Sequence, residues 1–228
     1  MENAAVNGKK IAAGKAIEYI KTGMTVGLGT GSTAYWAIQG IGEMVKNGLQ
    51  VRAIATSIQS EDLARELAIP IVPFAEIDHL DVTIDGADEV DQQLNLIKGG
   101  GGALLREKIV AAATKFYIII VDESKLVRHL GQFPLPVEVT PFGWEITGRR
   151  LRELGCTPKM RMKDGQPFLT DNQHYILDCS FGPIPDPASL HERVSAITGV
   201  MEDGFFINMA DIVIAGSPGG ETKVIARS

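Results

Sequence analysis

The stretch "MTVGLGTGST", residues 24–33, runs from a short β-rich segment through three glycines into a helix predicted from Thr33 to about Lys46, with Ser32 as its N-cap. Glycines at such a junction let backbone N–H groups approach an anion at the positive end of the helix. The stretch therefore predicts the strand–loop–helix unit of an α/β fold. It also predicts an anion site with the hydroxyls of Thr30, Ser32 and Thr33, although a tight turn without a ligand would use the same residues.

Two common phosphate-binding motifs do not fit this loop. A dinucleotide-binding fingerprint that begins at Gly27 and Gly29 requires a third glycine where Ser32 stands. A P-loop ends in Gly-Lys-Ser or Gly-Lys-Thr, and this loop contains no lysine. If the loop binds an anion, it belongs to neither of these two types.

Outward from this loop, strands and helices alternate over the first 130 residues, which predicts a mostly parallel sheet with helices on its faces. The further strands are predicted at "VRAIAT" (51–56), "IPIVPF" (69–74), "DVTID" (81–85) and "KFYIIIVDE" (115–123). The further helices are predicted at about 4–21, from Ser60 over "SEDLARELA", and over 103–115. Since ligands of open parallel sheets bind beyond the carboxyl ends of the strands, the loops that follow strands are the candidate site.

The pattern changes after "GQFPLPVEVTPFG", residues 131–143, where prolines interrupt regular structure. A helix over "WEITGRRLRELG", short strands and a second helix after "PDPAS" predict a smaller α+β domain at 131–205. The segment "ADIVIAG" (210–216) reads as a central strand that returns to the first sheet. We expect a large domain of residues 1–130 plus 206–228.

Composition excludes several classes of protein. The 228 residues are 45% hydrophobic and carry a net charge of -6, which disfavours nonspecific nucleic-acid binding. No apolar run approaches the roughly 18 residues of a membrane helix, and the N-terminus lacks the apolar core of a signal peptide. Cys156 and Cys179 have no metal or redox spacing. We expect a cytoplasmic protein that binds neither membrane nor nucleic acid.

The loop "DGADEVD", residues 85–91, directly follows a predicted strand. Asp85 and Asp88 flank Gly86 and Ala87, whose small side chains leave the loop open. Paired carboxylates there suit the hydroxyls of a sugar. Turn formation is the plain alternative, because aspartate often bonds its own backbone. Metal binding is the other, but the four histidines show no ligand spacing.

The stretch "NLIKGGGGALLREKIV", residues 95–110, places four glycines between Lys98 and a predicted helix that carries Glu107. Glycine is costly to order, so the run suggests that a ligand approaches the backbone closely. Glu107 shares a helix face with Ala103 and Ala111, while Leu105, Ile109 and Ala112 form the face expected to pack on the sheet. A flexible linker and a solvated glutamate are the alternatives. Lys125, in "DESK", follows another strand, although taken alone it is better explained as a surface lysine.

Taken together, the motifs "GLGTGSTA", "DGADE", "IKGGGGALLREKI", "DESK" and "FPLPVEV" resemble the type A ribose-5-phosphate isomerase family over essentially the whole chain. The resemblance implies a Rossmann-like domain, completed by a C-terminal strand, with an inserted ferredoxin-like α+β domain. It implies a homodimer or homotetramer that interconverts ribose 5-phosphate and ribulose 5-phosphate in the pentose phosphate pathway, with no metal and no other cofactor.

The resemblance also assigns roles to residues. Glu107 matches the family's proton-transferring base, and Asp85, Asp88 and Lys98 are expected to assist catalysis. The substrate-binding residues that it implies are Thr30, Gly31, Ser32, Thr33, Asp85, Gly86, Ala87, Asp88, Lys98, Gly99, Gly100, Gly101 and Lys125. Two positions depart from the common pattern: Gly102 where alanine is frequent, and Gln59 where some members carry aspartate or another polar residue.

Two other functions remain open at this point. A sugar-phosphate sensor of related fold would carry a DNA-binding helix-turn-helix, and the N-terminus has one predicted helix without basic character. A sugar-phosphate deaminase or hydrolase of related fold would need a histidine to handle water or amine. No histidine falls in the three loops.

Overall fold

The computed structural model describes residues 2–227, and these divide into two compact units. Unit 1 comprises the chain up to Ala87, Arg106–Leu126 and the segment from Met209 onwards. Unit 2 comprises Asp88–Leu105 and Val127–Asn208. Among the described residues, no helix combines the length and apolar character needed to cross a membrane.

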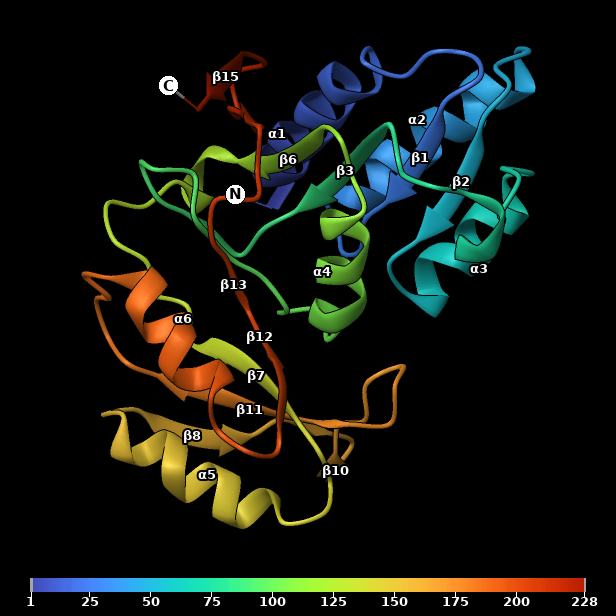
Figure 1. The fold of residues 1–228 in the computed structure, drawn as a ribbon. Helices are drawn as coiled ribbons and strands as arrows, with labels where there is room; N and C mark the ends of the chain where they lie inside the picture. Colours follow the sequence, from blue (N-terminus) through green and yellow to red (C-terminus); the bar gives the residue numbers. More distant parts are fainter. Residues whose placement is uncertain (1, 228) are drawn as a thin grey trace. The chain divides into compact units, whose positions relative to one another are not determined.

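Unit 1 is built on a six-stranded sheet in the order β15-β14-β6-β3-β1-β2 (Figure 1). Its strands are β1 (Thr25–Leu28), β2 (Arg52–Ala55), β3 (Val82–Gly86), β6 (Tyr117–Asp122), β14 (Ile212–Gly216) and β15 (Thr222–Ala226). All neighbours are parallel except β14 and β15, which pair antiparallel. The expected α/β fold is confirmed, as is the return of 210–216 to the first sheet.

The strand order reverses between β1 and β3, because the chain builds outward to β2 and then in the opposite direction to β6 and β14. Ligands of open α/β sheets bind at such a reversal, beyond the carboxyl ends of the strands. The two loops that flank this point are the ones after β1 and after β3. The topology therefore singles out two of the three predicted loops.

Helices pack on the faces of the sheet. They are α1 (Glu2–Ile17), α2 (Ala34–Lys46), α3 (Ile58–Glu66) and the short 3-10 turns η1 (Phe74–Glu76) and η2 (Glu123–Lys125). α1 packs on β6 and β14 and against α2, and its Ala12, Ala13 and Ala16 are fully buried in the main core. α4 (Leu104–Ala112) begins in unit 2 and continues in unit 1, where Val110 packs with Ile54 and Leu80.

Unit 2 contains an antiparallel sheet in the order β12-β7-β11-β8. The chain order is β7 (Leu135–Val139), α5 (Trp144–Glu153), β8 (Thr157–Met160), β11 (Tyr175–Ser180), α6 (Pro187–Ser195) and β12 (Val200–Asp203). This βαββαβ order with strands arranged 4-1-3-2 is the ferredoxin-like arrangement. The unit also holds the hairpin β9 (Met162–Lys163) with β10 (Gln166–Pro167), and the small sheet of β4 (Glu89–Val90), β5 (Leu96–Ile97) and β13 (Phe205–Phe206).

Several local predictions were wrong. The segment 69–74 is no strand: Pro70 and Pro73 lack the N–H of a ladder donor, and only one isolated bridge forms, between Ala53 and Ile71. α2 is preceded by Thr33 rather than Ser32, with no side-chain cap bond.

Two helices begin earlier than the sequence suggested. α3 starts at Ile58, because the hydroxyl of Ser57 accepts from the backbone N–H of Ser60 and caps the helix. α6 starts at Pro187, since the carboxylate of Asp186 caps it by accepting from the N–H of Ser189.

Candidate active site

The loop after β1 lies against the end of β3. The backbone N–H of Gly29 donates to the carbonyl of Ile84 at 2.9 Å, and that of Thr30 donates to Oδ1 of Asp85 at 3.1 Å. A Cβ on Gly29 would stand 2.2 Å from the same Oδ1, so only glycine fits there. Gly31 has φ +100°, a conformation that glycine adopts without strain. These glycines are therefore required by close approach and by a left-handed turn.

The three hydroxyls of the predicted anion site differ in their surroundings. The Thr30 hydroxyl lies 2.7 Å from Oγ1 of Thr56 and 2.8 Å from Oγ of Ser57, so it fastens the loop to the start of α3. Ser32 is exposed and Thr33 half-buried. Ser32 and Thr33 are thus better disposed to meet a ligand with their side chains than Thr30 is.

A cation that the sequence did not single out lies beside this loop. Nζ of Lys9, on α1, donates to Oγ of Ser32 at 3.0 Å. An ammonium group next to exposed hydroxyls and a helix N-terminus adds positive charge where an anion would bind. Nothing in the local sequence distinguishes Lys9 from its neighbour Lys10, which instead lies over the ring of Trp36 at 5.2 Å.

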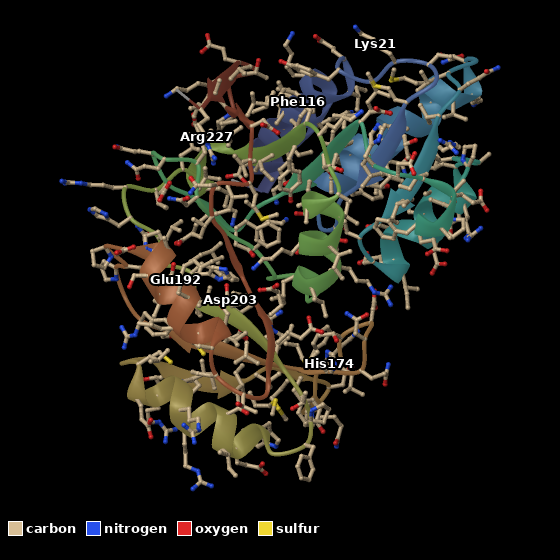
Figure 2. The ribbon with its side chains drawn as sticks, in the orientation of Figure 1. Lys21, Phe116, His174, Glu192, Asp203 and Arg227 are labelled. Carbon is tan, nitrogen blue, oxygen red and sulfur yellow. The ribbon has the colours of Figure 1, made fainter. Side chains whose placement is uncertain are left out.

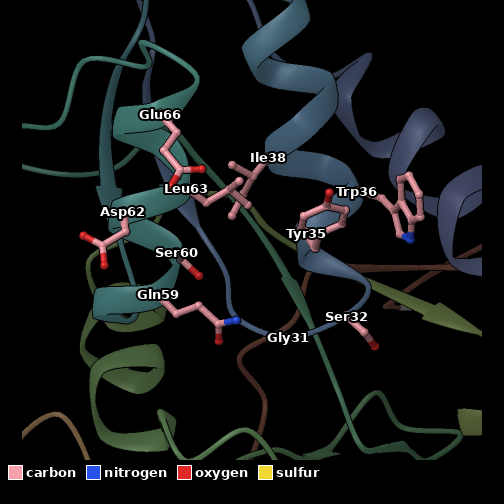
Figure 3. A pocket seen from close by; sticks show the side chains of 10 residues that line it. All are labelled: Gly31, Ser32, Tyr35, Trp36, Ile38, Gln59, Ser60, Asp62, Leu63 and Glu66. Carbon is pink, nitrogen blue, oxygen red and sulfur yellow. The ribbon is translucent and has the colours of Figure 1, made fainter.

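A cavity of about 670 Å³ opens from the same loop between α2 and α3. Figure 3 shows Gly31 and Ser32 at one end of it and the aromatic and acidic side chains of the two helices around it. Its lining residues are Gly31, Ser32, Tyr35, Trp36, Ile38, Gln59, Ser60, Asp62, Leu63 and Glu66. Gln59, one of the two departures from the family pattern, therefore faces this cavity.

Asp85 is fully buried at the end of β3. Its Oδ1 accepts from the backbone N–H groups of Thr30, at 3.1 Å, and of Gly86, at 2.7 Å. Its Oδ2 accepts from the phenol of Tyr117 at 3.2 Å. A turn-forming aspartate at a loop surface would be solvated, and this one is held inside unit 1 by donors from three segments.

Glu107 lies in the first turn of α4 and is 5% exposed, so the alternative of a solvated glutamate does not apply to it. Its face, with Ala103 and Ala111, is the buried one. The expectation that the other face, with Leu105, Ile109 and Ala112, packs on the sheet was wrong, because Ile109 is 50% exposed. Small alanines around the glutamate leave the carboxylate as the principal polar group of a buried helix face.

The remaining predicted residues of unit 1 are Gly86, Ala87 and Lys125. Gly86 ends β3 and stands near the loop after β1, since a Cβ on it would meet the carbonyl of Thr30 at 3.8 Å. Ala87 and Lys125 are half-buried. Lys125 ends η2, whose first turn is capped by Asp122 through the N–H of Ser124.

The glycine run belongs to unit 2, together with Asp88 and Lys98. The N–H of Gly100 donates to Oδ2 of Asp88 at 2.7 Å, so this donor of the run is engaged within the protein. Lys98 is 2% exposed, and its Nζ stands 5.3 Å from the centre of the Phe206 ring. A buried ammonium over an aromatic ring is held in place and kept from bulk water.

The rest of the run is shaped by its neighbours. Arg161 donates to the carbonyls of Gly99, at 2.8 Å, and Gly100, at 3.2 Å, while its guanidinium also binds Asp178. Gly102 has φ +83°, and a Cβ on it would meet the Phe168 ring at 2.5 Å. The positive φ and the lack of room for a Cβ explain why position 102 is a glycine. The bonds from Arg161 show that the run is a braced turn rather than a flexible linker. Arg161 was missed because its position in the sequence is remote from the run.

One group of side chains in the described part of the chain has the composition of a metal site: His191, Glu202 and Asp203 offer ligand atoms within 4.8 Å of one another. Asp203, labelled in Figure 2, is fully buried on β12, and its Oδ2 lies 2.8 Å from Nδ1 of His191. Its Oδ1 accepts from the N–H of Phe205. These bonds tie α6 to β12 and give the cluster a structural role.

Comparison with known proteins identifies relatives along the whole chain. Residues 52–220 match the family model described as ribose 5-phosphate isomerase A (phosphoriboisomerase A). Ribose-5-phosphate isomerase A of Bacillus mycoides is 53% identical over 216 residues, covering 94% of this chain and 98% of the relative.

Solved structures agree with this. A ribose 5-phosphate isomerase from Plasmodium falciparum superposes with a TM-score of 0.93 at 41% identity, covering 96% of this chain and 98% of the other. A D-ribose-5-phosphate isomerase in complex with phospho-erythronic acid gives 0.93 at 42% identity, covering 96% and 97%.

Proposed function

The chain belongs to the ribose 5-phosphate isomerase A family, isomerases of the pentose phosphate pathway that interconvert ribose 5-phosphate and ribulose 5-phosphate, and we propose that Glu107 carries the proton in this reaction. The observation that supports this role is the burial of Glu107, at 5% exposure, on a helix face of alanines. A base that transfers a proton between neighbouring carbons must be held still beside both of them.

The reaction assigned to Glu107 is a proton transfer between adjacent carbons. The carboxylate takes the proton from C2 of the open-chain aldose, and the released electron pair forms the C1–C2 double bond of an enediolate. The hydroxyl proton on O2 passes to O1. Glu107 then returns its proton to C1 while the C2 carbonyl forms. The developing oxyanion needs a fixed donor, and Lys98, a buried ammonium, is the group proposed for it.

The phosphate is assigned to the loop after β1. Backbone N–H groups at the start of α2, the hydroxyls of Ser32 and Thr33, and the ammonium of Lys9 are suited to a dianion. Lys125 is proposed to contribute a second cation. The hydroxyl of Thr30 fastens this loop, and Gly31, which has no side chain, is proposed to contribute its backbone N–H.

Asp85 and Asp88 are assigned to the sugar hydroxyls and to ring opening. Ribose 5-phosphate is mainly a furanose, which has to open before C2 is acidic. A carboxylate takes the proton of the anomeric hydroxyl, whose electron pair forms the C1 carbonyl. The C1–O4 bond breaks, O4 takes a proton from water, and the carboxylic acid returns its proton to water. Gly86, Ala87, Asp88 and the turn from Gly99 to Gly101 are proposed as further sugar-binding residues on the strength of the family resemblance.

Assembly and compartment are part of the proposal. We assign the protein to the cytoplasm, as a homodimer or homotetramer, on the strength of the family resemblance. Light scattering coupled to size-exclusion chromatography measures the assembly: a mass of one chain, 24.5 kDa, at micromolar concentration contradicts it.

A direct assay tests the function against its alternatives. Purified protein incubated with ribose 5-phosphate should produce ketose absorbance without release of ammonia or inorganic phosphate. Because the proposed base is a carboxylate and the oxyanion donor a lysine, the rate should survive exhaustive EDTA treatment. Loss on chelation with recovery on adding a divalent ion contradicts the mechanism, and binding without turnover favours a sugar-phosphate sensor.

A further inference from the structure

Tyr117 is a buried phenol for which the reaction described so far has no use. It begins β6, is 1% exposed, and is among the largest fully buried side chains of the described residues. Its hydroxyl donates to Oδ2 of Asp85 at 3.2 Å. Its backbone N–H donates to Oδ2 of Asp211 at 2.7 Å, so the residue is anchored at both ends. A tyrosine serving only as packing would not need its hydroxyl aimed at a carboxylate.

The surroundings keep this phenol protonated. Burial raises the pKa of the Tyr117 hydroxyl well above its usual range, and the negative charges of Asp85 and Glu107 raise it further. The negative charges of both carboxylates therefore act on the hydroxyl of Tyr117. A phenol that does not ionise near neutral pH is a permanent hydrogen-bond donor and cannot act as a base.

The hydrogen bond from the Tyr117 hydroxyl completes the set of donors that hold the Asp85 carboxylate. Oδ1 of Asp85 accepts from two backbone N–H groups, of Thr30 and Gly86, and the backbone holds these donors still. Oδ2 accepts from the side chain of Tyr117. Without the phenol, Oδ2 loses a donor in a fully buried place, where replacement by water is costly.

We propose that Tyr117 is a positioning residue that fixes Asp85 for opening of the furanose ring, a role that rests on the proposed function of this site. Tyr117 touches no reacting atom. It holds the carboxylate that accepts the anomeric proton, and a displacement of that carboxylate by about 1 Å can reduce the rate by two orders of magnitude. Proton transfer by Glu107 does not depend on it.

The test separates ring opening from proton transfer. Ribulose 5-phosphate has no free hydroxyl at C5 and stays acyclic, so exchange of its C1 hydrogen in D₂O needs the enediolate step but no ring opening. For Tyr117→Phe we expect conversion of ribose 5-phosphate to fall about tenfold. Early C1 deuteration of ribulose 5-phosphate, followed by NMR before aldose accumulates, should stay within about twofold of wild type.

The matched control is Tyr19→Phe. Tyr19 stacks on Phe116, the residue before Tyr117, with ring centroids 5.8 Å apart, and it lies outside the proposed site (Phe116 is labelled in Figure 2). Tyr19→Phe should leave both rates unchanged. Equal loss of isomerisation and exchange in Tyr117→Phe overturns the inference, because the phenol would then act through Glu107. The inference is also overturned if Tyr117→Phe keeps both rates at the wild-type level.

A double-mutant cycle, with each rate divided by the folded fraction of that variant, keeps the inference falsifiable if Tyr117→Phe is partly unfolded. In an Asp85→Asn background, Tyr117→Phe should cause no further loss of isomerisation, since the group it positions is gone. Multiplicative losses contradict the inference. Failure of the proposed function looks different: Glu107→Gln would then retain C1 exchange, whatever happens at Tyr117.

Discussion

The backbone N–H of Thr30 donates to Oδ1 of Asp85 at 3.1 Å, joining the loop after β1 to the end of β3, two residues that lie 55 positions apart in the sequence. The bond spans the place where the strand order reverses between β1 and β3. The loop proposed to hold the phosphate and the aspartate proposed to hold the sugar are therefore one rigid arrangement, and a change in either is expected to disturb the other.

Gly29→Ala tests this arrangement. The new Cβ would stand 2.2 Å from Oδ1 and 2.5 Å from Cα of Asp85, and backbone cannot yield as a side chain can. We expect a loss of stability of about 1–3 kcal/mol, measured by urea denaturation, and a severe loss of activity. Gly14→Ala is the control, because a Cβ at this exposed helical position meets nothing within 4 Å. Equal stability of the two variants would contradict the close approach.

Lys9→Gln tests the cation beside the phosphate loop. The substitution keeps a polar side chain, one atom shorter, but removes the charge near Ser32. We expect KM for ribose 5-phosphate to rise roughly three- to tenfold, since the pair is partly exposed and screened, with little change in kcat. Lys10→Gln, which removes the neighbouring charge over Trp36, should leave KM unchanged. Equal effects of the two substitutions would show a general charge effect rather than a specific contact.

Gly100→Ala tests the braced turn. A Cβ there would approach Oδ1 of Asp88 to 2.5 Å, and a flexible carboxylate can swing away from it. The fold should therefore survive, with a melting temperature near that of the parent, while Asp88 leaves its position. We expect a raised KM for ribose 5-phosphate. An unchanged KM would mean that the bond between Gly100 and Asp88 has no part in substrate binding.

The sequence predicted the strands and loops that have strong local signals. The glycines after β1 and the small residues between Asp85 and Asp88 marked the ends of buried strands, and β1 and β3 confirm that placement. Periodicity alone chose the wrong buried face of α4, because Ile109 is apolar yet exposed while the charged Glu107 is buried. Which face of α4 is buried depends on the segments that pack around the helix, and the local sequence pattern carries no information about them.

The groups missed by the sequence share one cause. Lys9 is one of two adjacent lysines, and only the packing of α1 beside the phosphate loop distinguishes it. Tyr117 is hidden in an apolar run that reads as an ordinary strand, and its significance comes from the pairing of β6 with β3, which carries Asp85. Both contacts are formed by segments far apart in the chain. The roles of Glu107, Asp88 and Lys98 remain predictions.

Glu107→Gln is the most direct test of the proposed mechanism. Glutamine keeps the size of the side chain and most of its hydrogen bonding but cannot accept the C2 proton. Removing a general base lowers the rate by about 10²–10⁴, and one group serves both proton steps, so we expect kcat to fall by about 10⁴ or more. Binding of an unreactive analogue, arabinose 5-phosphate, measured by calorimetry, should change little, because the phosphate and hydroxyl contacts lie with other residues.

The control for that experiment is Glu153→Gln, an exposed glutamate at the end of α5, which should keep the full rate. C1 exchange in D₂O gives a second readout: it should disappear in Glu107→Gln, because both exchange and isomerisation pass through the enediolate. A folded Glu107→Gln variant that isomerises at the parental rate would show that the base has been misassigned. Asp85, the other buried carboxylate beside Tyr117, would then be the group to replace next.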